Sequence, residues 1–438
     1  MIEIILILFS IFNFFIIFSS PVIFFNKKKN YLREINIFDF MILNAIIYIN
    51  LLLFFSFISL NTKYLFLIIS LIGYSFFFFN FKIYLNLIKN NLINFLLFFF
   101  ILFCFFVKIS YDPILAWDGA HHWLMKAKVF FDGGYIKNIK GVIMDYYPHL
   151  GTYLWAFFWK NSYLQIEYFG RFFFIFIFII TFFSCFYNFQ TDTSLMKSSL
   201  IMVLIFLSTD FMLFKGYQEY LLFFSFYACS RIFIVFERAI SNKKDDILYL
   251  LLFGFVTNIF LWTKQEGFFH FFIINFVFLI HSKIKLSYKF FYTSLIIALI
   301  FLFLLIKRYF FDSFQFHENI LKPSIFENLK PSVLLLKLLL ITKYIFISFF
   351  KNPIWLVIFF CAFFLFQKNK HYLRQTHLFI ITFLFLEFAL LYAIFLFQDA
   401  DLKFLLPLTL SRVLFPISGF LIFLINDFFN KSKISNSI

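Results

Sequence analysis

The chain has 438 residues, of which 63% are hydrophobic and 26% aromatic, and its formal net charge at pH 7 is +16. A soluble core of this length could not bury so much apolar surface, so the composition excludes a soluble globular protein and indicates a polytopic helical membrane protein. The basic residues lie mainly in short segments between apolar stretches, which is typical of membrane topology and argues against a nucleic-acid-binding domain.

About 20 apolar residues cross the hydrocarbon core of a bilayer, and on this basis we expect an all-α polytopic transmembrane protein with about 13 spans. The expected spans cover residues 4–25, 36–59, 64–81, 92–108, 169–188, 199–214, 220–236, 247–262, 268–281, 289–306, 354–367, 376–397 and 413–427. The first is expected to be an uncleaved helix, because Glu3 precedes it and Lys27 to Lys29 follow it, the reverse of a signal peptide.

With the N-terminus outside, the short basic segments fall in the cytoplasm, as the positive-inside rule requires. The stretch 331–350 is apolar, but Lys337 and Lys343 interrupt it, so we expect an interfacial helix on the outer face. The polar segments expected on that face are 112–160, 216–219, 264–267, 307–331 and 398–412. The expected localisation is therefore the inner (plasma) membrane, with a multi-pass chain whose functional residues gather on the periplasmic or outer face.

These assignments divide the chain into five parts. They are N-terminal transmembrane helices (1–108), an outer-face loop (109–168), central transmembrane helices (169–306), a second outer-face loop with the interfacial helix (307–353), and C-terminal helices with a cytoplasmic tail (354–438). The first loop is far longer than a connection between two helices needs. We therefore expect it to carry short interfacial helices and the chemistry of the protein.

Within this loop, residues 120–131 have a helical pattern that ends at Asp132-Gly133-Gly134. Asp118 is then either the N-cap of that helix, accepting a backbone N–H one turn ahead, or a functional carboxylate at the membrane surface. Lys126 and Lys128 either meet an anionic lipid headgroup or extend from an interfacial helix toward water. A second short helix is expected at 151–159.

The three histidines of the loop, His121, His122 and His149, lack the spacing of a metal site, so we expect no metal and no cofactor. Further along the chain, Lys264 and Glu266 either pair with each other in a tight turn or serve the function. Glu387, inside an apolar run, is expected to be a buried structural acid.

Several of these segments together resemble bacterial C-type (GT-C) integral membrane glycosyltransferases. The resemblance covers roughly residues 105 to 425 and rests on ordered motifs: Trp117-Asp118, Trp123, Lys126-Ala127-Lys128, Tyr147-Pro148, Gly216-Tyr217-Gln218-Glu219, Thr263-Lys264-Gln265-Glu266-Gly267 and Ser411-Arg412-Val413-Leu414. Two features differ from the family. Three extra spans precede the loop, and Asp118 is followed by Gly119 rather than by a second acid.

The resemblance implies a GT-C-like fold, a polyprenyl-phosphate-linked sugar donor and inverting transfer, on the outer face, to a lipid, glycan or protein acceptor. Asp118 is then the general base, and its acidic partner is Asp112, Asp145 or Glu219. The expected donor-phosphate contacts are Lys264 and Arg412, with Lys126 and Lys128 as weaker ones. The expected substrate-binding residues are Trp117, His122, Tyr147, His149, Gln218 and Glu266.

Two other functions stay open: a surface-polysaccharide polymerase or ligase, and a flippase or transporter of lipid-linked sugar. A transporter should carry ionisable residues in the middle of its spans, and many transporters show internal repeats. Apart from Glu387, the ionisable residues here lie at helix ends, and no strong repeat links the two halves. This distribution favours chemistry at the membrane surface.

Overall fold

The computed structural model describes residues 2–29, 36–186, 194–209, 211–241, 246–311, 331–368, 375–397 and 401–431. Throughout these ranges the regular secondary structure is helical, and no strand occurs in them. Nine helices within the described ranges are long and apolar enough to cross a membrane. The all-helical, membrane-embedded class expected from the composition is therefore confirmed, while the GT-C fold and the number of spans stay predictions.

The chain forms two compact units. Unit 1 comprises Met1–Asp145, His149–Phe224 and Phe429–Ile438, and unit 2 comprises Tyr146–Pro148 and Ser225–Phe428. The helices of unit 1 are α1 (Ile2–Lys29), α2 (Ile37–Ser56), α3 (Thr62–Phe79), α4 (Phe81–Asn90), α5 (Leu92–Tyr111), η1 (Gly119–Leu124), α6 (Met125–Phe131), η2 (Ile136–Ile139), α7 (Leu150–Lys160), α8 (Glu167–Phe186), α9 (Ser194–Ser208) and η3 (Phe211–Phe214). Helix α10 (Glu219–Ser241) begins in unit 1 and continues into unit 2.

Helix α8 is the centre of unit 1. Every side chain from Tyr168 to Phe186 is buried, because α2, α5, α7 and α9 pack around it. Stacked rings hold these contacts, with centroids 3.9 Å apart for Phe106 and Phe172 and 4.7 Å apart for Phe158 and Phe173. Such pairs add about 0.5–1.5 kcal/mol each to the burial of the rings. The phenylalanines of α8 are therefore core residues.

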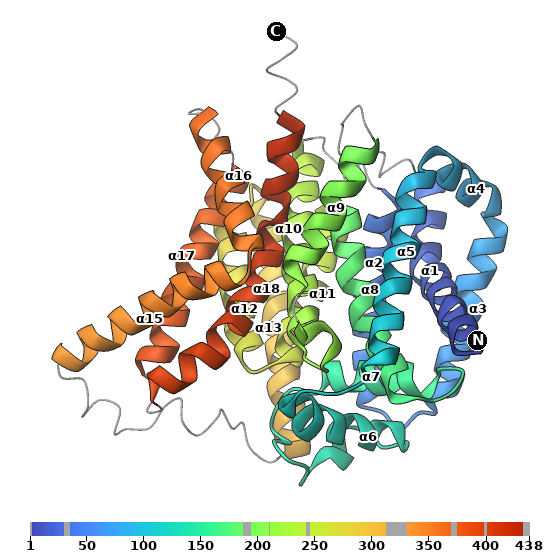
Figure 1. The fold of residues 1–438 in the computed structure, drawn as a ribbon, viewed down its shortest axis with the longest axis horizontal. Helices are drawn as coiled ribbons and strands as arrows, with labels where there is room; N and C mark the ends of the chain where they lie inside the picture. The colour runs from blue at the N-terminus through green and yellow to red at the C-terminus, as the bar shows by residue number, and fades with distance from the viewer. Residues whose placement is uncertain are drawn as a thin grey trace. The chain divides into compact units, whose positions relative to one another are not determined.

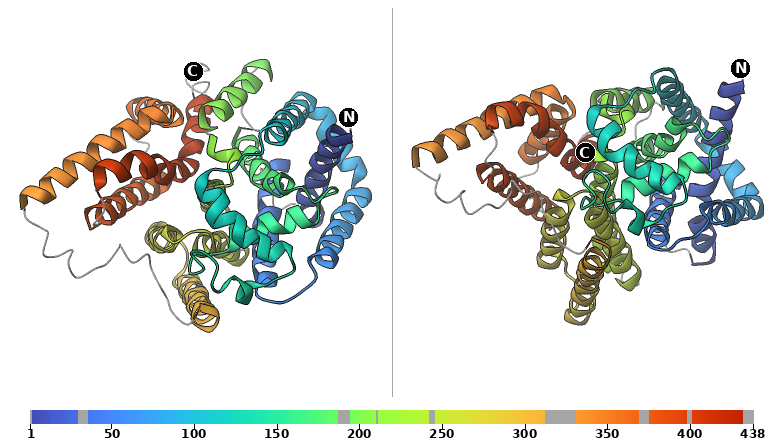
Figure 2. Two further views of the ribbon diagram at one scale, coloured as in Figure 1. Left: turned by 60° about the horizontal axis from the view of Figure 1, so that its bottom comes forward. Right: turned by 90° about the horizontal axis from the view of Figure 1, so that it is seen from below.

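A layer of short helices covers one end of the long helices in unit 1. It consists of η1, α6 and α7, which lie beneath the ends of α5 and α8 in Figure 1 and face the reader in the right-hand view of Figure 2. Helix α7 packs on both α6 and α8. The two short helices expected in the 109–168 loop are thus confirmed as helices, at Met125–Phe131 and Leu150–Lys160.

The remaining helices belong to unit 2. They are α11 (Asp246–Thr263), α12 (Glu266–His281), α13 (Leu286–Phe311), α15 (Pro331–Lys351), α16 (Ile354–Lys368), α17 (Gln375–Leu396) and α18 (Leu402–Lys431). Helix α12 packs against α11 and α17, and α15 packs against α16 and α17. Stacked rings of Phe253 and Phe278, 4.2 Å apart, tie α11 to α12.

Every expected span overlaps a helix, but the expected start of the last span is wrong. Helix α18 begins at Leu402, so residues 402–412 are helical and do not form the expected loop. The Asp401 carboxylate accepts the backbone N–H of Lys403 at 2.9 Å and starts the helix there. Residues 398–400 and 312–330, which complete two of the expected outer-face segments, lie outside the described residues.

Helix α15 also differs from the expectation. It is 21 residues long and meets the length and composition of a membrane span, although we expect it to be interfacial. The Lys337 ammonium donates to the carbonyl of Leu396, 3.1 Å away, at the end of α17. This contact offsets part of the cost of a lysine in an apolar helix. Figure 1 shows α15 running obliquely to α16 and α17, and its interfacial placement stays a prediction.

Cysteine labelling tests this placement. We expect Asp132→Cys and Lys368→Cys, each in a Cys104→Ser background, to react with an impermeant maleimide from opposite faces of the membrane. Seven of the spans predicted from the sequence separate the two positions when α15 is interfacial. Labelling of both positions from the same face would contradict the prediction and make α15 a span.

Candidate functional site

The expected helix around Asp118 contains a wide π-turn. Residues Gly119–Leu124 are π-helical and continue into α6, which ends at Asp132 before Gly133, whose φ is +99°. The capping role considered for Asp118 is wrong. Its φ and ψ are −60° and −41° and its side chain makes no capping hydrogen bond, because the Ala120 amide already donates to Ala116 at 2.8 Å and the chain is helical at Asp118. π-Turns are frequent at functional sites.

This turn lies directly against the segment that precedes α10. The Ala116 amide donates to the Lys215 carbonyl at 3.2 Å, and a side-chain carbon on Gly119 would overlap that carbonyl oxygen. Gly216 has a φ of +83° and touches Leu115. Only glycine permits this approach of two backbones. The structure therefore brings together two segments that the resemblance singles out, Trp117-Asp118 and Gly216-Tyr217-Gln218-Glu219.

A buried arginine holds both segments in place. Arg171, in the first turns of α8, is 0% exposed and binds the Glu167 carboxylate in a bidentate pair at 2.8 and 2.7 Å. The same guanidinium donates to the carbonyl of Pro113 at 2.7 Å and to the carbonyl of Phe214. One side chain thus joins the chain just before Asp118 to the chain just before Gly216. Sequence reasoning missed Arg171, although the four-residue spacing from Glu167 predicts a helical ion pair.

Asp112 is part of an ion-pair cluster at the end of α5. Its Oδ2 atom lies 3.1 Å from the Lys215 ammonium and 3.8 Å from that of Lys108. The hydrogen bond from Lys215, aided by both positive charges, holds the pKa of the Asp112 carboxyl below its ordinary value despite partial loss of water. Asp112 therefore stays ionised and engaged, which makes it a weaker candidate for a general base. Lys215 was not predicted from the sequence.

An aromatic cluster borders Asp118 on the surface. The Trp117 indole is 63% exposed, the His121 ring stacks on it and the His122 ring meets its edge, each with centroids 4.9 Å away. The Nδ1 atom of His121 also contacts the Trp117 carbonyl at 3.0 Å. The substrate-binding role expected for Trp117 and His122 stays a prediction; an exposed indole can stack on one face of a sugar ring.

Two expected contact residues face inward instead. Lys126 is 0% exposed and donates to the carbonyl of Met144. His149 is also 0% exposed, with its Nε2 atom 2.8 Å from the Ser56 hydroxyl and its ring against Phe130. Both predictions are corrected, because each side chain is buried and has a polar partner within unit 1. Lys128 is exposed, as a phosphate contact requires.

Gln218 and Glu219 lie at the start of α10 and are 0% and 1% exposed. The Gln218 amide packs on Gly151 at the beginning of α7, where a side-chain carbon would overlap it. Neither polar atom of the amide has a hydrogen-bond partner among the described residues. A buried amide of this kind costs free energy unless a ligand or water completes it. The expected role of Gln218 as a ligand contact stays a prediction.

The other expected site residues belong to unit 2. The Lys264 ammonium lies 2.8 Å from the Glu266 carboxylate in the short connection between α11 and α12, so the predicted ion pair is confirmed. Arg412 lies within α18, and Tyr147 follows Tyr146, whose carbonyl accepts from Lys307 at 2.7 Å. The convergence of Asp118 with Lys264 and Arg412 in one pocket stays a prediction, because Asp118 belongs to unit 1.

Glu387 is buried, as expected, and has a partner that the sequence did not reveal. Its Oε2 atom lies 2.8 Å from Nδ1 of His270, between α17 and α12, and the two side chains are 1% and 5% exposed. The rings of Phe226 and Phe260 surround the imidazole. A pair of ionisable side chains at this depth is rare in membrane helices and marks either a structural tie or an ion pathway.

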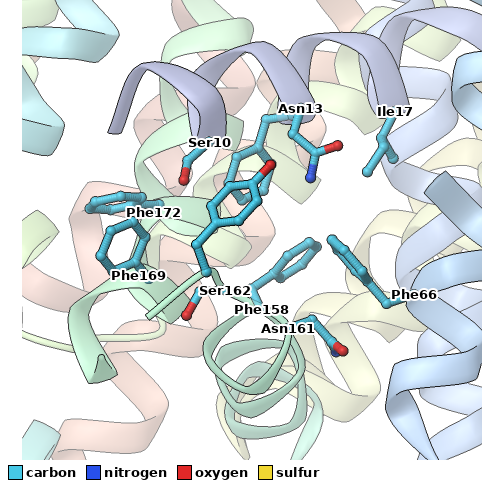
Figure 3. Close-up of a pocket in the computed structure, with 11 residues that line it drawn as sticks. Ser10, Asn13, Ile17, Phe66, Phe158, Asn161, Ser162, Phe169 and Phe172 are labelled. Atoms are coloured by element: carbon cyan, nitrogen blue, oxygen red, sulfur yellow. The ribbon is translucent and has the colours of Figure 1, made fainter. Parts of the chain in front are cut away.

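A separate pocket lies at the other end of α7. Figure 3 shows that side chains of α1, α3, α7, the chain after α7, and α8 line it. Its polar lining groups include Asn13 from α1 and Asn161 and Ser162 from the turn after α7. All lining residues are uncharged and none is a predicted site residue. The pocket is therefore no phosphate site.

Comparison of the chain with protein-family models, with curated proteins and with solved structures finds no match. The resemblance to GT-C glycosyltransferases accordingly rests on the residues of this chain alone.

The Arg171 contacts generate a stability prediction. We expect Arg171→Met to lower the free energy of unfolding by about 3–5 kcal/mol, since it leaves the Glu167 carboxylate and two carbonyls without their donor. A large fall in Tm of the purified protein would report the loss. The double variant Arg171→Met/Glu167→Gln should recover part of it, because the unpaired charge is removed. An unchanged Tm for Arg171→Met would contradict the anchoring role.

Proposed function

We propose that the chain is a membrane glycosyltransferase of the inner (plasma) membrane. It moves a sugar from a polyprenyl-phosphate carrier to a lipid, glycan or protein acceptor on the outer face. One observation carries the proposal: the turn with Trp117 and Asp118 packs against Lys215 and Gly216 at the start of the second motif. Motifs about a hundred residues apart thus share one end of unit 1, and charged groups gather there.

The chemistry follows from the groups at this end. The acceptor hydroxyl attacks the anomeric carbon of the donor sugar, Asp118 takes the hydroxyl proton, and the bond from that carbon to the phosphate oxygen breaks. The electron pair leaves with the phosphate, and attack from the opposite side inverts the anomeric centre. The exposed Trp117 indole receives the sugar ring, while the Gln218 amide offers a donor and an acceptor to a hydroxyl.

The second acid is better assigned to Glu219 than to Asp112, since Asp112 is engaged by two lysines. Lys264, Arg412 and Lys128 are the proposed contacts of the departing phosphate. The Glu266 carboxylate pairs with the Lys264 ammonium and orients it. A surface-polysaccharide polymerase or ligase would use the same chemistry with a longer glycan, so it differs from this proposal only in the acceptor.

Replacement of Asp118 tests the transfer. Purified protein supplied with a labelled polyprenyl-phosphate sugar and envelope acceptors should transfer label, and Asp118→Asn should reduce the rate by about 10²–10⁴-fold, the usual contribution of a general base. Asp132→Asn is the matched control, because Asp132 is exposed at the end of α6 and should keep its activity. Full activity of folded Asp118→Asn would remove Asp118 from the mechanism.

A flippase or transporter of lipid-linked sugar is the second candidate function. It is favoured by the Glu387–His270 pair, which lies between apolar helices, with Glu387 in the middle of α17 and His270 in the second turn of α12. The Glu387 Oε1 atom is buried and lacks a hydrogen-bond partner within the described part of the chain. A carboxylate with an open acceptor in an apolar surrounding is the kind of group that takes up a proton in transporters.

Glu387→Gln separates the two functions. Glutamine keeps the size of the side chain and its contact with His270, but it cannot ionise. A transferase should keep its transfer rate within about threefold, because the pair is structural, while a proton-coupled transporter should lose uptake of labelled lipid-linked sugar into proteoliposomes. Thr382→Val, which removes the 2.9 Å contact of Thr382 with His281 at the same helix interface, is the control.

A further inference from the structure

One face of α5 is an apolar stripe exposed from end to end. Leu96, Phe100 and Cys104 follow at four-residue intervals, and Leu96 and Phe100 are 60% and 57% exposed. Residues with this spacing lie above one another on a helix. The next residue in the series is Lys108, whose side chain is 54% exposed. The stripe therefore ends at an ammonium group.

A second element brings another lysine to the same end. Helix α9 packs beside α5 (Figure 1), with the ring of Phe206 6.3 Å from that of Phe105. The chain then passes through η3, where Phe214 also contacts Phe105, and reaches Lys215. The Lys215 and Lys108 ammonium groups approach the same oxygen of Asp112. Two helices thus end in lysines that share one carboxylate.

The charges of this cluster are unequal. Lys108, Lys215 and Arg171 are cations, and Asp112 and Glu167 are their partner carboxylates. These five side chains carry one net positive charge. Because Arg171 is fully buried and paired with Glu167, the net positive charge of the cluster lies on the two lysines. A lysine ammonium has three donors and binds phosphate as a point charge.

We propose that the end of α5 is a binding site for one lipid phosphate, with the phosphate on Lys108 and Lys215 and the hydrocarbon chain along Leu96, Phe100 and Cys104. The distance from Leu96 to Lys108 along the helix is about 18 Å at 1.5 Å per residue, which suits a long alkyl or polyprenyl chain. Tyr111, the last residue of α5, is exposed and directly precedes Asp112, and tyrosine is a residue type enriched at the level of the headgroups. Free phosphate lacks the chain that the stripe accepts.

This site goes beyond the proposed function, since it requires no sugar transfer. It also differs from the phosphate contacts predicted from the sequence, none of which is Lys108 or Lys215. Lipid phosphate is abundant at the membrane surface, and a ligand that combines a negative charge with a hydrocarbon chain matches both halves of the site.

The exposed Cys104 provides a direct probe, because Cys185, Cys229 and Cys361 are buried. The full-length protein in an uncharged maltoside detergent is labelled with N-ethylmaleimide, with Cys104→Ser giving the background. We expect dodecyl phosphate to slow labelling of Cys104 at least fivefold. Inorganic phosphate should give no protection at the same concentration. Equal labelling rates with and without dodecyl phosphate would overturn the proposal.

Charge variants identify the phosphate contacts. Lys108→Gln and Lys215→Gln should each raise the dodecyl phosphate concentration needed for protection at least tenfold, whereas Lys137→Gln, an exposed lysine of η2, should not. Lys108 is exposed, so its variant tests the site even if Lys215→Gln fails to fold. Unchanged protection in Lys108→Gln would assign the effect to the chain alone and refute the phosphate site. Protection retained in Asp118→Asn separates this result from any failure of sugar transfer.

Discussion

The architecture of unit 1 depends on a guanidinium that has no access to water. Removing a cation from water costs several kcal/mol, and hydrogen bonds to the charged group offset that cost. Arg171 makes four such hydrogen bonds, to Glu167 on its own helix and to the carbonyls of Pro113 and Phe214. Those carbonyls belong to connections that leave different helices, so satisfying one side chain fixes both connections on α8. Asp118 and Gln218 follow within five residues of the fixed points.

The fold was largely predictable because apolar runs of about 20 residues leave a chain few alternatives to membrane helices. Local polarity decided two of the predictions. Lys337 and Lys343 in the apolar stretch of α15 predict an interfacial helix, and this placement stays a prediction, although the Lys337 ammonium has a carbonyl partner on α17. Polar residues before residue 413 predicted a loop, yet the leucines from Leu402 onward sustain a helix that Asp401 starts. Sequence alone does not reveal a partner such as the Leu396 carbonyl, since it lies on another helix 59 residues along the chain.

The residues of the candidate site were also predictable in part. Asp118, Trp117 and the segment at Gly216 stand out as polar residues in an apolar chain, and the structure brings their segments together. Lys126 and His149 are polar residues of the same loop, but both are buried, and they have partners at Met144, after α6, and at Ser56, on α2. Lys215 and Arg171 gave no signal beyond a four-residue spacing, because their importance lies in carbonyls and carboxylates remote in sequence.

Lys215 connects the turn that carries Asp118 with the ion-pair cluster at the end of α5. Its carbonyl accepts the Ala116 amide and limits the space at Gly119, while its ammonium contacts Asp112. Backbone and side chain of one residue therefore touch both the turn that carries Asp118 and the cluster that faces the apolar stripe of α5. A phosphate that draws the ammonium away from Asp112 changes the forces on the same residue that supports the π-turn. We therefore expect the proposed lipid binding at α5 to influence the geometry of Asp118 through this single residue.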